Sequence, residues 1–325
     1  MVDSSRIIET VALQISGFAI QWLCSLRKGF ALDYDETQRG SHMSLKGKTA
    51  IVSAAGRGIG KGISIALAKA GADVVVNSYG TDTTAGTVAA VEAEGAKALG
   101  FPGDITKPDV MLACVEAATS KFGHVDILVN NVGAGPKEGK APEPGPLGMA
   151  SMLWDALYGQ NLKPAVLMSE AVIPHFKAQK SGKIVNISSI AGRASLSDKM
   201  LEMFVHPSYG AMKAALVNYT QTMAEMLGPF NINVNAVAPG IVWTDAWLGN
   251  AKRAVKSIPE FQGMDARVWF EGIARGDYPH IFDRTPLRRE QTVEDIGNAV
   301  VFLVSDNAMN ITGQTLMVDG GMVKI

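Results

Sequence analysis

Residues 49–71 read TAIVSAAGRGIGKGISIALAKAG, and this stretch decides the fold. Thr49–Ser53 has the apolar, β-branched composition of a buried strand, and Ile59–Ala70 has the pattern of a helix that ends at Gly71. The turn between them, residues 54–60, contains three glycines. Such a turn lets the backbone approach a pyrophosphate and directs the N-terminus of the helix toward it. Because a strand precedes the glycines and a helix comes after them, the stretch predicts a nucleotide-binding βα unit.

The rest of the chain repeats this alternation of short β-branched runs and helix-length segments. Further strands are expected at Asp73–Asn77, Lys97–Phe101, Ile127–Asn131, Lys183–Ser189, Ile232–Ala238 and Thr315–Val318. Helices are expected at Asp82–Glu94, Pro108–Phe122, Met152–Gln179 (with bends at Pro164 and Pro174), Ser208–Leu227 and Val293–Ser305. The alternation predicts a doubly wound, Rossmann-type α/β fold, with a parallel sheet of about seven strands and helices on both faces.

Charge and residue counts exclude several classes of protein. The 325 residues include 30 Lys and Arg against 31 Asp and Glu, so no basic excess would attract nucleic acid or an anionic membrane. The two cysteines, Cys24 and Cys114, cannot form a disulfide framework or a zinc cluster. The five histidines lack the spacing of a metal-binding motif. We therefore expect a cytoplasmic protein with no metal and no nucleic-acid or membrane partner.

The first 42 residues differ in character from the rest of the chain. Arg39–Met43 reads RGSHM, which resembles the scar of a cloning vector, so we expect a foreign leader at 1–42 and one domain at 43–325. The apolar run Val11–Leu26 is shorter than the roughly 20 residues that a membrane span needs. The alternative is a natural amphipathic extension that packs on a partner.

Two segments carry side chains suited to acid–base chemistry. Tyr209 and Lys213 are four residues apart on a predicted helix and therefore share one face. An ammonium beside a phenol stabilises the phenolate and lowers the pKa of the tyrosine. Ser188 and Ser189 end a predicted buried strand, where hydroxyls can face a cleft at the carboxyl edge of the sheet.

Together these parts resemble the short-chain dehydrogenase/reductase family, from about Leu45 to Met322, and in particular its bacterial 3-oxoacyl-thioester reductases. Further matching elements are the segments 103–105 (GDI), 130–133 (NNVG), 161–163 (NLK), 239–240 (PG) and 311–321 (ITGQTLMVDGG). The expected catalytic residues are Asn161, Ser189, Tyr209 and Lys213. The expected cofactor-binding residues are Ser53, Gly56, Arg57, Gly58, Ile59, Gly60, Asn77, Asp104, Ile105, Asn131, Val132, Gly133, Tyr209, Lys213, Pro239, Gly240 and Thr244.

The resemblance implies reversible hydride transfer between a nicotinamide cofactor and a carbonyl carbon. Tyr209 then exchanges the hydroxyl proton, Ser189 binds the substrate oxygen, and Lys213 lowers the pKa of the tyrosine and binds the nicotinamide ribose. Asn161 helps to hold a water that links Lys213 to solvent. Relatives commonly form dimers or tetramers, so a homo-oligomer, most simply a homotetramer, is expected.

Two residues favour NADP(H) over NAD(H), which stays possible. Asn77 stands at the end of the second strand, where an acid normally binds the adenosine ribose, and it lacks the charge that would repel a 2′-phosphate. Arg57, inside the glycine turn, can form charge-assisted hydrogen bonds with that phosphate.

The chain departs from the family pattern at three places. Ala54 replaces the first glycine of the turn and Val132 replaces an alanine. Ser189 and Tyr209 are twenty positions apart (209 − 189), more than the usual interval. The insertion at Ser197–His206, with Met200, Leu201, Met203 and Phe204, must loop out for both hydroxyls to converge. Ser188 is the alternative if it does not.

The segment 241–290, here called the lid segment, lies where the family carries its substrate lid and is long and aromatic. It contains Trp243, Trp247, Phe261, Trp269, Phe270 and Phe282. An apolar lid suits a medium or bulky hydrophobic alcohol or ketone, although the same residues could simply pack the lid or a subunit interface. The expected function is an NADP(H)-dependent secondary-alcohol/ketone oxidoreductase. The alternatives are a 3-oxoacyl-thioester reductase, an epimerase or dehydratase, and a non-catalytic nucleotide sensor or scaffold.

Overall fold

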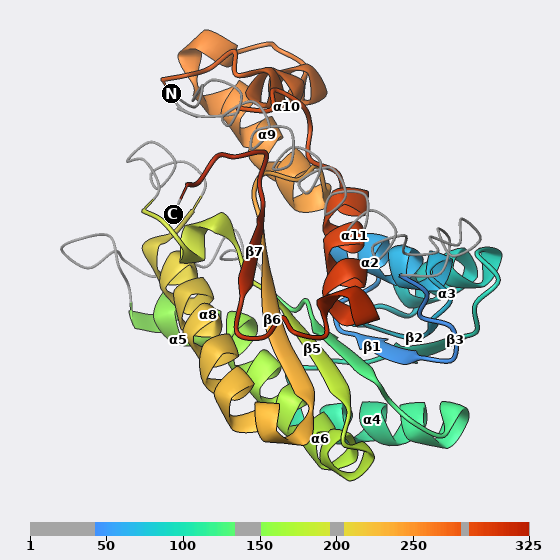
Figure 1. Ribbon diagram of the computed structural model, residues 1–325. Helices are drawn as coiled ribbons and strands as arrows, with labels where there is room; N and C mark the ends of the chain where they lie inside the picture. Colours follow the sequence, from blue (N-terminus) through green and yellow to red (C-terminus); the bar gives the residue numbers. More distant parts are fainter. Residues whose placement is uncertain (1–42, 134–150, 196–204, 281–285, 325) are drawn as a thin grey trace, which may run out of the picture. The chain divides into compact units, whose positions relative to one another are not determined.

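Seven parallel strands form the sheet, in the order β3-β2-β1-β4-β5-β6-β7 (Figure 1). The computed structural model describes residues 43–133, 151–195, 205–280 and 286–324, which belong to one unit, Met43–Ile325. The strands are β1 (Thr49–Val52), β2 (Asp73–Ser78), β3 (Ala98–Pro102), β4 (Ile127–Asn130), β5 (Gly182–Ile187), β6 (Ile232–Pro239) and β7 (Thr315–Val318). The predicted Rossmann-type doubly wound sheet is therefore confirmed.

Helices cover both faces of this sheet (Figure 1). One face carries α2 (Gly58–Lys69), α3 (Thr81–Ala93) and α11 (Val293–Val304). The other carries α4 (Pro108–Phe122), α5 (Ser151–Asn161), α6 (Lys163–Gln179) and α8 (Pro207–Leu227). Beyond the carboxyl ends of the strands lie α9 (Asp245–Ser257) and α10 (Ala266–Arg275). Short 3₁₀ helices are η2 (Ile190–Gly192), η3 (Gly228–Phe230), η4 (Pro259–Phe261) and η5 (Asp306–Ala308).

The order of the strands reverses between β1 and β4. β1 pairs with β2 on one side and with β4 on the other, so Val52 is in register with both Val76 and Val129. Chain connections leave these two strands toward opposite faces of the sheet, which opens a crevice at their carboxyl ends. This switch point is where a doubly wound sheet places its ligand.

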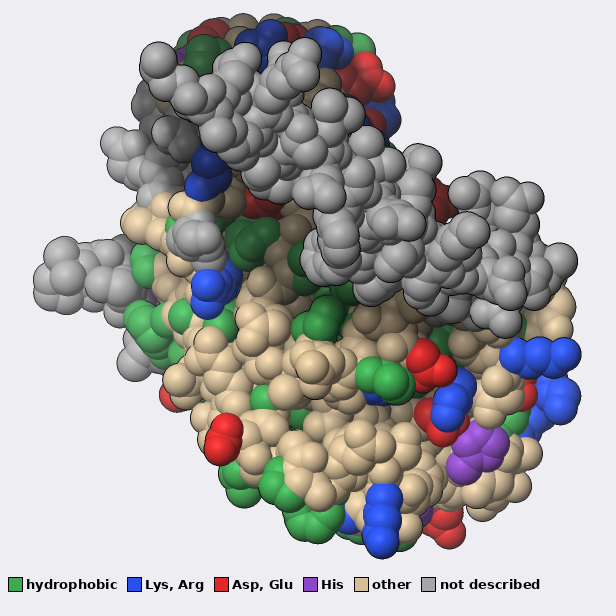
Figure 2. Space-filling model, in the orientation of Figure 1, with side chains coloured by type: hydrophobic (Ala, Val, Ile, Leu, Met, Phe, Trp, Pro, Cys, Tyr) green, Lys and Arg blue, Asp and Glu red, His purple; other side chains and the backbone are tan. Residues whose placement is uncertain are grey.

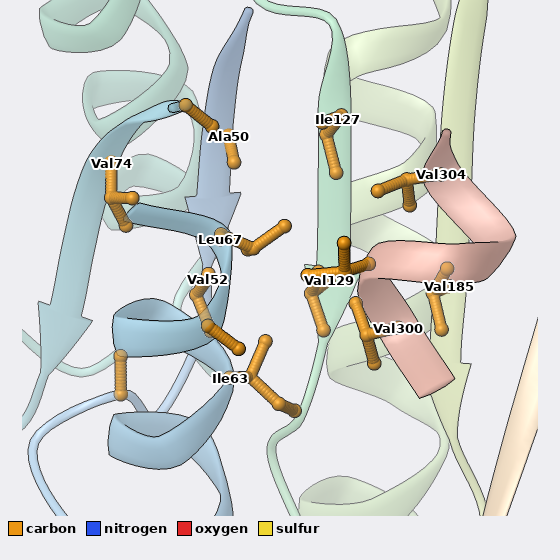
Figure 3. Packing of buried hydrophobic residues seen from close by; sticks show 14 of the residues in the cluster. Ala50, Val52, Ile63, Leu67, Val74, Ile127, Val129, Val185, Val300 and Val304 are labelled. Carbon is orange, nitrogen blue, oxygen red and sulfur yellow. The ribbon is translucent and has the colours of Figure 1, made fainter. Parts of the chain in front are cut away.

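Two hydrophobic clusters hold the helices on the sheet. Figure 3 shows the first, in which Ile63 and Leu67 of α2 and Val300 of α11 meet Val52 of β1 and Val129 of β4. The second lies on the opposite face and contains residues of α4, α6 and α8, among them Met111, Met168 and Leu227. Side chains alternate between the faces of a strand, which is why neighbouring residues of one strand belong to different clusters.

The lid segment has a hydrophobic cluster of its own, as one of the two interpretations of its aromatic residues predicted. Trp269, Phe270 and Phe261 are at most 3% exposed and pack with residues of α9 and α10. Trp243 and Trp247 are partly buried against this cluster. Part of the aromatic content therefore folds the lid segment itself. Phe282 and most of the Ser197–His206 insertion lie outside the described residues.

One predicted helix is two helices. The expected single helix Met152–Gln179 is interrupted at Leu162, which separates α5 from α6. Pro164 falls in the first turn of α6, a position that needs no backbone donor. Pro174 lies inside α6, as the sequence suggested for one of the bends.

The described surface carries both signs of charge, which lie interspersed on the face in Figure 2. Among the described residues, no helix is long and apolar enough to cross a membrane. In the same part of the chain, no group of three or more His, Cys, Asp or Glu side chains is placed to hold a metal ion.

Candidate active site

The glycine turn after β1 leaves the first turn of α2 open. Arg57 is the N-cap residue of α2 and makes no capping hydrogen bond with its side chain, so the first N–H groups of the helix are available to an anion. Gly58 has a φ of +53°, and a methyl group added at Gly60 would overlap the carbonyl oxygen of Ala54. The turn therefore needs these glycines, and its open N–H groups suit the pyrophosphate of a dinucleotide.

Two of the predicted cofactor residues, Ser53 and Asn131, hold this turn in place. The hydroxyl of Ser53 donates to the carbonyl of Val129 and accepts from the backbone N–H of Asn131 at 2.9 Å. The amide of Asn131 donates to the carbonyls of Ser53 and Ala54, both at 3.2 Å. These bonds tie the glycine turn to β4 across the switch point.

The structure corrects the expectation that the Asn77 side chain faces the adenosine ribose. Asn77 is 1% exposed, and its amide nitrogen donates to the carbonyls of Phe101 (3.0 Å) and Gly103 (3.3 Å). β2 continues by one residue to Ser78, whose hydroxyl lies 3.2 Å from that of Thr83. A methyl group added at Gly56 would collide with both hydroxyls. Ser78 and Thr83 thus stand beside the glycine turn, and neither was predicted from the sequence.

The other predicted cofactor residues surround the same crevice. Thr244 caps α9, and its methyl group would lie 3.4 Å from a Cβ added at Gly58. Arg57 is well exposed, and its guanidinium lies 3.7 Å from the carboxylate of Asp245. Asp104 accepts from the backbone and hydroxyl of Thr106. The remaining predicted residues near the strand ends are Ile105 (buried), Val132 (packed on the second cluster), and Pro239 and Gly240 at the end of β6.

The structure brings Ser189 and Tyr209 together despite their long separation in sequence. A side-chain hydrogen bond from Ser189 acts on the Tyr209 phenol. The two segments lie close together. A methyl group added at Gly210 would lie only 2.9 Å from the carbonyl oxygen of Ala191. Ser188, the alternative, donates instead to the backbone carbonyl of Lys213 at 3.0 Å.

Lys213 and Asn161 both approach Gly133, which follows β4. The Nζ of Lys213 lies 5.7 Å from the centre of the Tyr209 ring and donates to the carbonyl of Ile187 at 2.8 Å. A methyl group added at Gly133 would lie 2.7 Å from that Nζ and 2.8 Å from the Oδ1 of Asn161. Asn161 is buried and donates to the carbonyl of Leu157. All four expected catalytic side chains therefore lie around the ends of β4 and β5.

Burial sets the proton affinities of this group. Desolvation raises the pKa of Tyr209, and the hydrogen bond from Ser189 partly opposes this increase. Desolvation also lowers the pKa of Lys213 from 10.5 to about 8. The sequence predicted that Lys213 lowers the pKa of Tyr209. In the structure, the loss of solvation is the largest influence on the pKa of both side chains.

Comparison with known proteins identifies the family. Residues 48–253 match the family model described as short chain dehydrogenase. The chain belongs to the short-chain dehydrogenase/reductase family. Residues 270–323 of this short-chain dehydrogenase/reductase also match a model described as enoyl-(acyl carrier protein) reductase.

The relatives of this short-chain dehydrogenase/reductase are named as dehydrogenases or reductases of alcohol or ketone substrates. It is 35% identical to 7alpha-hydroxysteroid dehydrogenase of Escherichia coli K12, over 87% of this chain and 97% of the relative. It is 32% identical to a 3-oxoacyl-acyl-carrier-protein reductase of Staphylococcus epidermidis, over 85% and 98%. L-sorbose reductase of Gluconobacter frateurii, solved with NADPH and L-sorbose, superimposes with a TM-score of 0.74 at 29% identity, over 87% and 99%. A 7alpha-hydroxysteroid dehydrogenase solved with NADH superimposes with a TM-score of 0.71 at 34% identity, over 88% and 98%.

One buried network of this short-chain dehydrogenase/reductase went unnoticed in the sequence. The amide of Asn130 donates to the Oδ1 of Asn186 at 2.9 Å, and the amide of Asn186 donates to the hydroxyl of Thr220 at 2.9 Å. The chain of bonds links β4, β5 and α8 directly beneath Ile187, the residue that anchors Lys213. Three polar residues in otherwise apolar elements are the signal that could have revealed it, since buried polar groups need partners.

Proposed function

We propose that this enzyme interconverts a secondary alcohol and a ketone with NADP(H), on a medium or bulky hydrophobic substrate. The observation that supports the reaction best is the convergence of Ser189, Tyr209, Lys213 and Asn161 beside an open helix N-terminus. The open N–H groups of α2 would hold the pyrophosphate, and Lys213 would hold the ribose of the nicotinamide. The bound nicotinamide supplies or accepts the hydride.

The side chains of the chain itself handle the proton and the developing charge. As the carbonyl carbon gains hydride, Tyr209 donates its phenolic proton to the carbonyl oxygen. The hydroxyl of Ser189 donates a hydrogen bond to the same oxygen and stabilises its negative charge. Lys213 stabilises the phenolate that remains, and Asn161 helps to hold the water through which the proton is replaced. The oxidation of an alcohol runs through the same groups in reverse.

Three features support NADP(H): Arg57, as expected from the sequence, and Ser78 and Thr83 in place of Asn77. β2 ends in the hydroxyl of Ser78, whereas a carboxylate normally binds the free 2′-hydroxyl of NAD. The hydroxyl of Thr83 lies 3.2 Å from that of Ser78, so two neutral hydroxyls beside Gly56 could donate hydrogen bonds to a phosphate without repelling its charge. Arg57 is exposed at the same turn and can pair with the phosphate. Solved relatives bind either cofactor, NADPH in one and NADH in the other.

The lid segment supports a hydrophobic substrate. Trp243 and Trp247 are partly exposed at the edge of the lid cluster, next to Thr244 at the glycine turn. Both rings contact Phe270 at a steep angle rather than face to face, with ring centres 4.7 Å and 5.9 Å from its centre and interplanar angles of 58° and 62°. They are the aromatic side chains of the lid segment that we propose to contact substrate. We also propose a cytoplasmic homo-oligomer, as is common in the family.

The loss of NADPH absorbance on a panel of ketones tests the proposal, with NADH run in parallel. Tyr209→Phe should reduce kcat by roughly three orders of magnitude or more, because the proton donor is lost. Tyr219→Phe, which removes a hydroxyl farther along the same helix, is the matched control and should retain activity. Turnover that survives in Tyr209→Phe would contradict the assignment of the proton donor. Cofactor binding without turnover on any substrate would favour the sensor alternative.

A 3-oxoacyl thioester is the second candidate substrate. The 32% identity to a 3-oxoacyl-acyl-carrier-protein reductase and the match of residues 270–323 to an acyl-carrier-protein reductase model favour it. Including acetoacetyl-CoA in the same panel separates the two. A kcat/KM for the thioester far above that of cyclic ketones would assign the enzyme to acyl thioesters.

A further inference from the structure

His206 is the N-cap residue of α8. Its ring Nδ1 accepts from the backbone N–H of Ser208 at 3.3 Å and lies 2.6 Å from the hydroxyl of the same residue. Because a backbone N–H can only donate, Nδ1 is unprotonated, and the proton of the neutral ring is on Nε2. The bonds of Nδ1 to Ser208 thus fix the orientation of the ring and leave the Nε2–H group as its hydrogen-bond donor.

This donor has no protein partner in the described part of the chain. The Nε2 of His206 is buried and makes no hydrogen bond with any described residue. A buried donor without an acceptor costs free energy, and native proteins contain few such atoms. An acceptor brought by a ligand would satisfy it.

The position of His206 points to the substrate as that ligand. The backbone N–H of Tyr209 donates to the carbonyl of His206 at 2.9 Å, so one turn separates the imidazole from the proposed proton donor. The residue before it, Val205, packs against the hydrophobic cluster of the lid segment. His206 therefore lies where the lid segment meets the helix of Tyr209.

We propose that the Nε2–H of His206 binds a second oxygen of the substrate, apart from the one that Tyr209 protonates. The preferred substrates are then ketones or alcohols with a further acceptor oxygen, such as oxo esters or hydroxy ketones, within a mainly hydrophobic body. His206 is a specificity-determining residue in this arrangement, and the inference rests on the proposed function. It explains why a histidine, rather than an ordinary capping residue, begins α8.

Two substitutions separate the donor from the cap. In His206→Asn, the side-chain oxygen can still accept from the N–H of Ser208, since asparagine is a good N-cap, but the distal donor is lost. In His206→Gln, the amide nitrogen can reach the position of Nε2, whereas the cap is lost. If His206 only caps the helix, His206→Asn should affect both stability and activity little, and His206→Gln should lower both. If His206 also binds substrate, His206→Asn should be the variant with the lower kcat/KM for the oxygen-bearing substrate. His206→Gln should still be the less stable variant.

The two probes are cyclohexanone and ethyl 2-oxocyclohexanecarboxylate, which share a ring ketone and differ in an ester group. The measured quantity is the ratio of kcat/KM for the oxo ester to that for cyclohexanone, with NADPH. We expect His206→Asn to lower this ratio about tenfold, the equivalent of one hydrogen bond, with an unchanged melting temperature. His206→Gln should keep the ratio within about threefold and melt at a lower temperature. An unchanged ratio in His206→Asn, or an equal loss on both probes, would overturn the inference.

A binding measurement keeps the inference distinguishable from the proposed function. In the Tyr209→Phe variant saturated with NADPH, the ¹⁵N-resolved NMR signal of the His206 Nε2–H should shift when the oxo ester is added and not when cyclohexanone is added. If the shift is seen but the wild type turns over no ketone, the proposed function is overturned and the role of His206 in binding stands. Turnover without the shift would overturn the role of His206 alone.

Discussion

The ammonium of Lys213 donates a 2.8 Å hydrogen bond to the carbonyl of Ile187, the last residue of β5. Lys213 is 3% exposed, so this charge is held by the backbone of the central sheet rather than by a surface counter-ion. The four-residue spacing to Tyr209 places the two side chains on one helix face, and the bond to Ile187 fixes where the ammonium ends. Anything that moves the end of β5 therefore moves the cation of the site.

The first prediction concerns stability and pH. The pKa of Lys213 is about 8 in the folded protein and 10.5 in the unfolded chain, so the unfolded chain binds more protons between these two values. Stability should therefore rise with pH across this window, by about 3 kcal/mol in total. Urea unfolding of the wild type and of Lys213→Met at pH 7, 9 and 10 measures the effect, because other titrating groups cancel in the difference. Parallel curves for the two proteins would show that Lys213 is not a desolvated cation.

The second prediction concerns cofactor choice. Ser78→Asp places a carboxylate beside the proposed 2′-phosphate site and should raise the KM for NADPH on the order of tenfold or more, with a gain for NADH. Asn77→Asp is the matched control, because that side chain points into the sheet edge. Its carboxylate would face the carbonyls of Phe101 and Gly103, and we expect a loss of about 3 kcal/mol of stability instead of a switch. A cofactor switch in Asn77→Asp and none in Ser78→Asp would restore the original expectation for Asn77.

The third prediction concerns the glycine turn. Ala54 has a φ of +50°, a conformation that costs a residue with a Cβ on the order of 1 kcal/mol. Ala54→Gly should therefore stabilise the protein by up to about 1 kcal/mol. Ala55→Gly, at the next position and fully buried, should destabilise it, since a buried methyl group is lost without any relief of strain. Thermal unfolding of the two variants tests the contrast, and equal destabilisation by both would contradict it.

The fourth prediction concerns the lid segment. Trp269 is fully buried in the lid cluster, whereas its neighbour Val268 is 49% exposed. Trp269→Ala should destabilise the lid segment by about 3 kcal/mol or more, with faster proteolysis within 241–290 and a lower kcat/KM. Binding of NADPH, measured by fluorescence, should change much less. Val268→Ala is the control on the same helix, and equal protease sensitivity of the two variants would contradict the separate lid core.

Local patterns were enough to predict the sheet and much of the site. The run at Thr315–Val318 became β7 with the expected bounds, and the spacing of Tyr209 and Lys213 placed both on α8. Alternating β-branched runs are read directly from sequence because burial on both faces of a parallel strand demands them. Features of the site that depend on contacts between segments distant in the sequence were harder to predict. The approach of Ser189 to Tyr209 requires Gly210 to pack against Ala191, which no sequence spacing reveals.

One strand boundary was misplaced and the role of the lid aromatics was left open, and both have simple physical causes. The end of β2 was placed one residue early, at Asn77 instead of Ser78, and a shift of one residue turns a side chain to the opposite face of a strand. The aromatic residues of the lid segment could equally have lined a substrate site or packed together, because both environments need the same residue types. The cap signals were present in the sequence, since Asp265 and Gly276 bound α10, but a high density of aromatic residues is equally typical of ligand contact.

The separate cluster of the lid segment has a consequence for how this enzyme can evolve. Its fully buried members, such as Trp269 and Phe270, belong to neither cluster that holds the helices on the sheet. Mutations that reshape the lid segment therefore leave the packing of the glycine turn and of the Tyr209 helix largely intact. We therefore expect the lid segment to tolerate substitutions of a size that would unfold the protein if they fell in the sheet. For the same reason, the segment is a natural unit for recombination between relatives that differ in substrate but share the sheet.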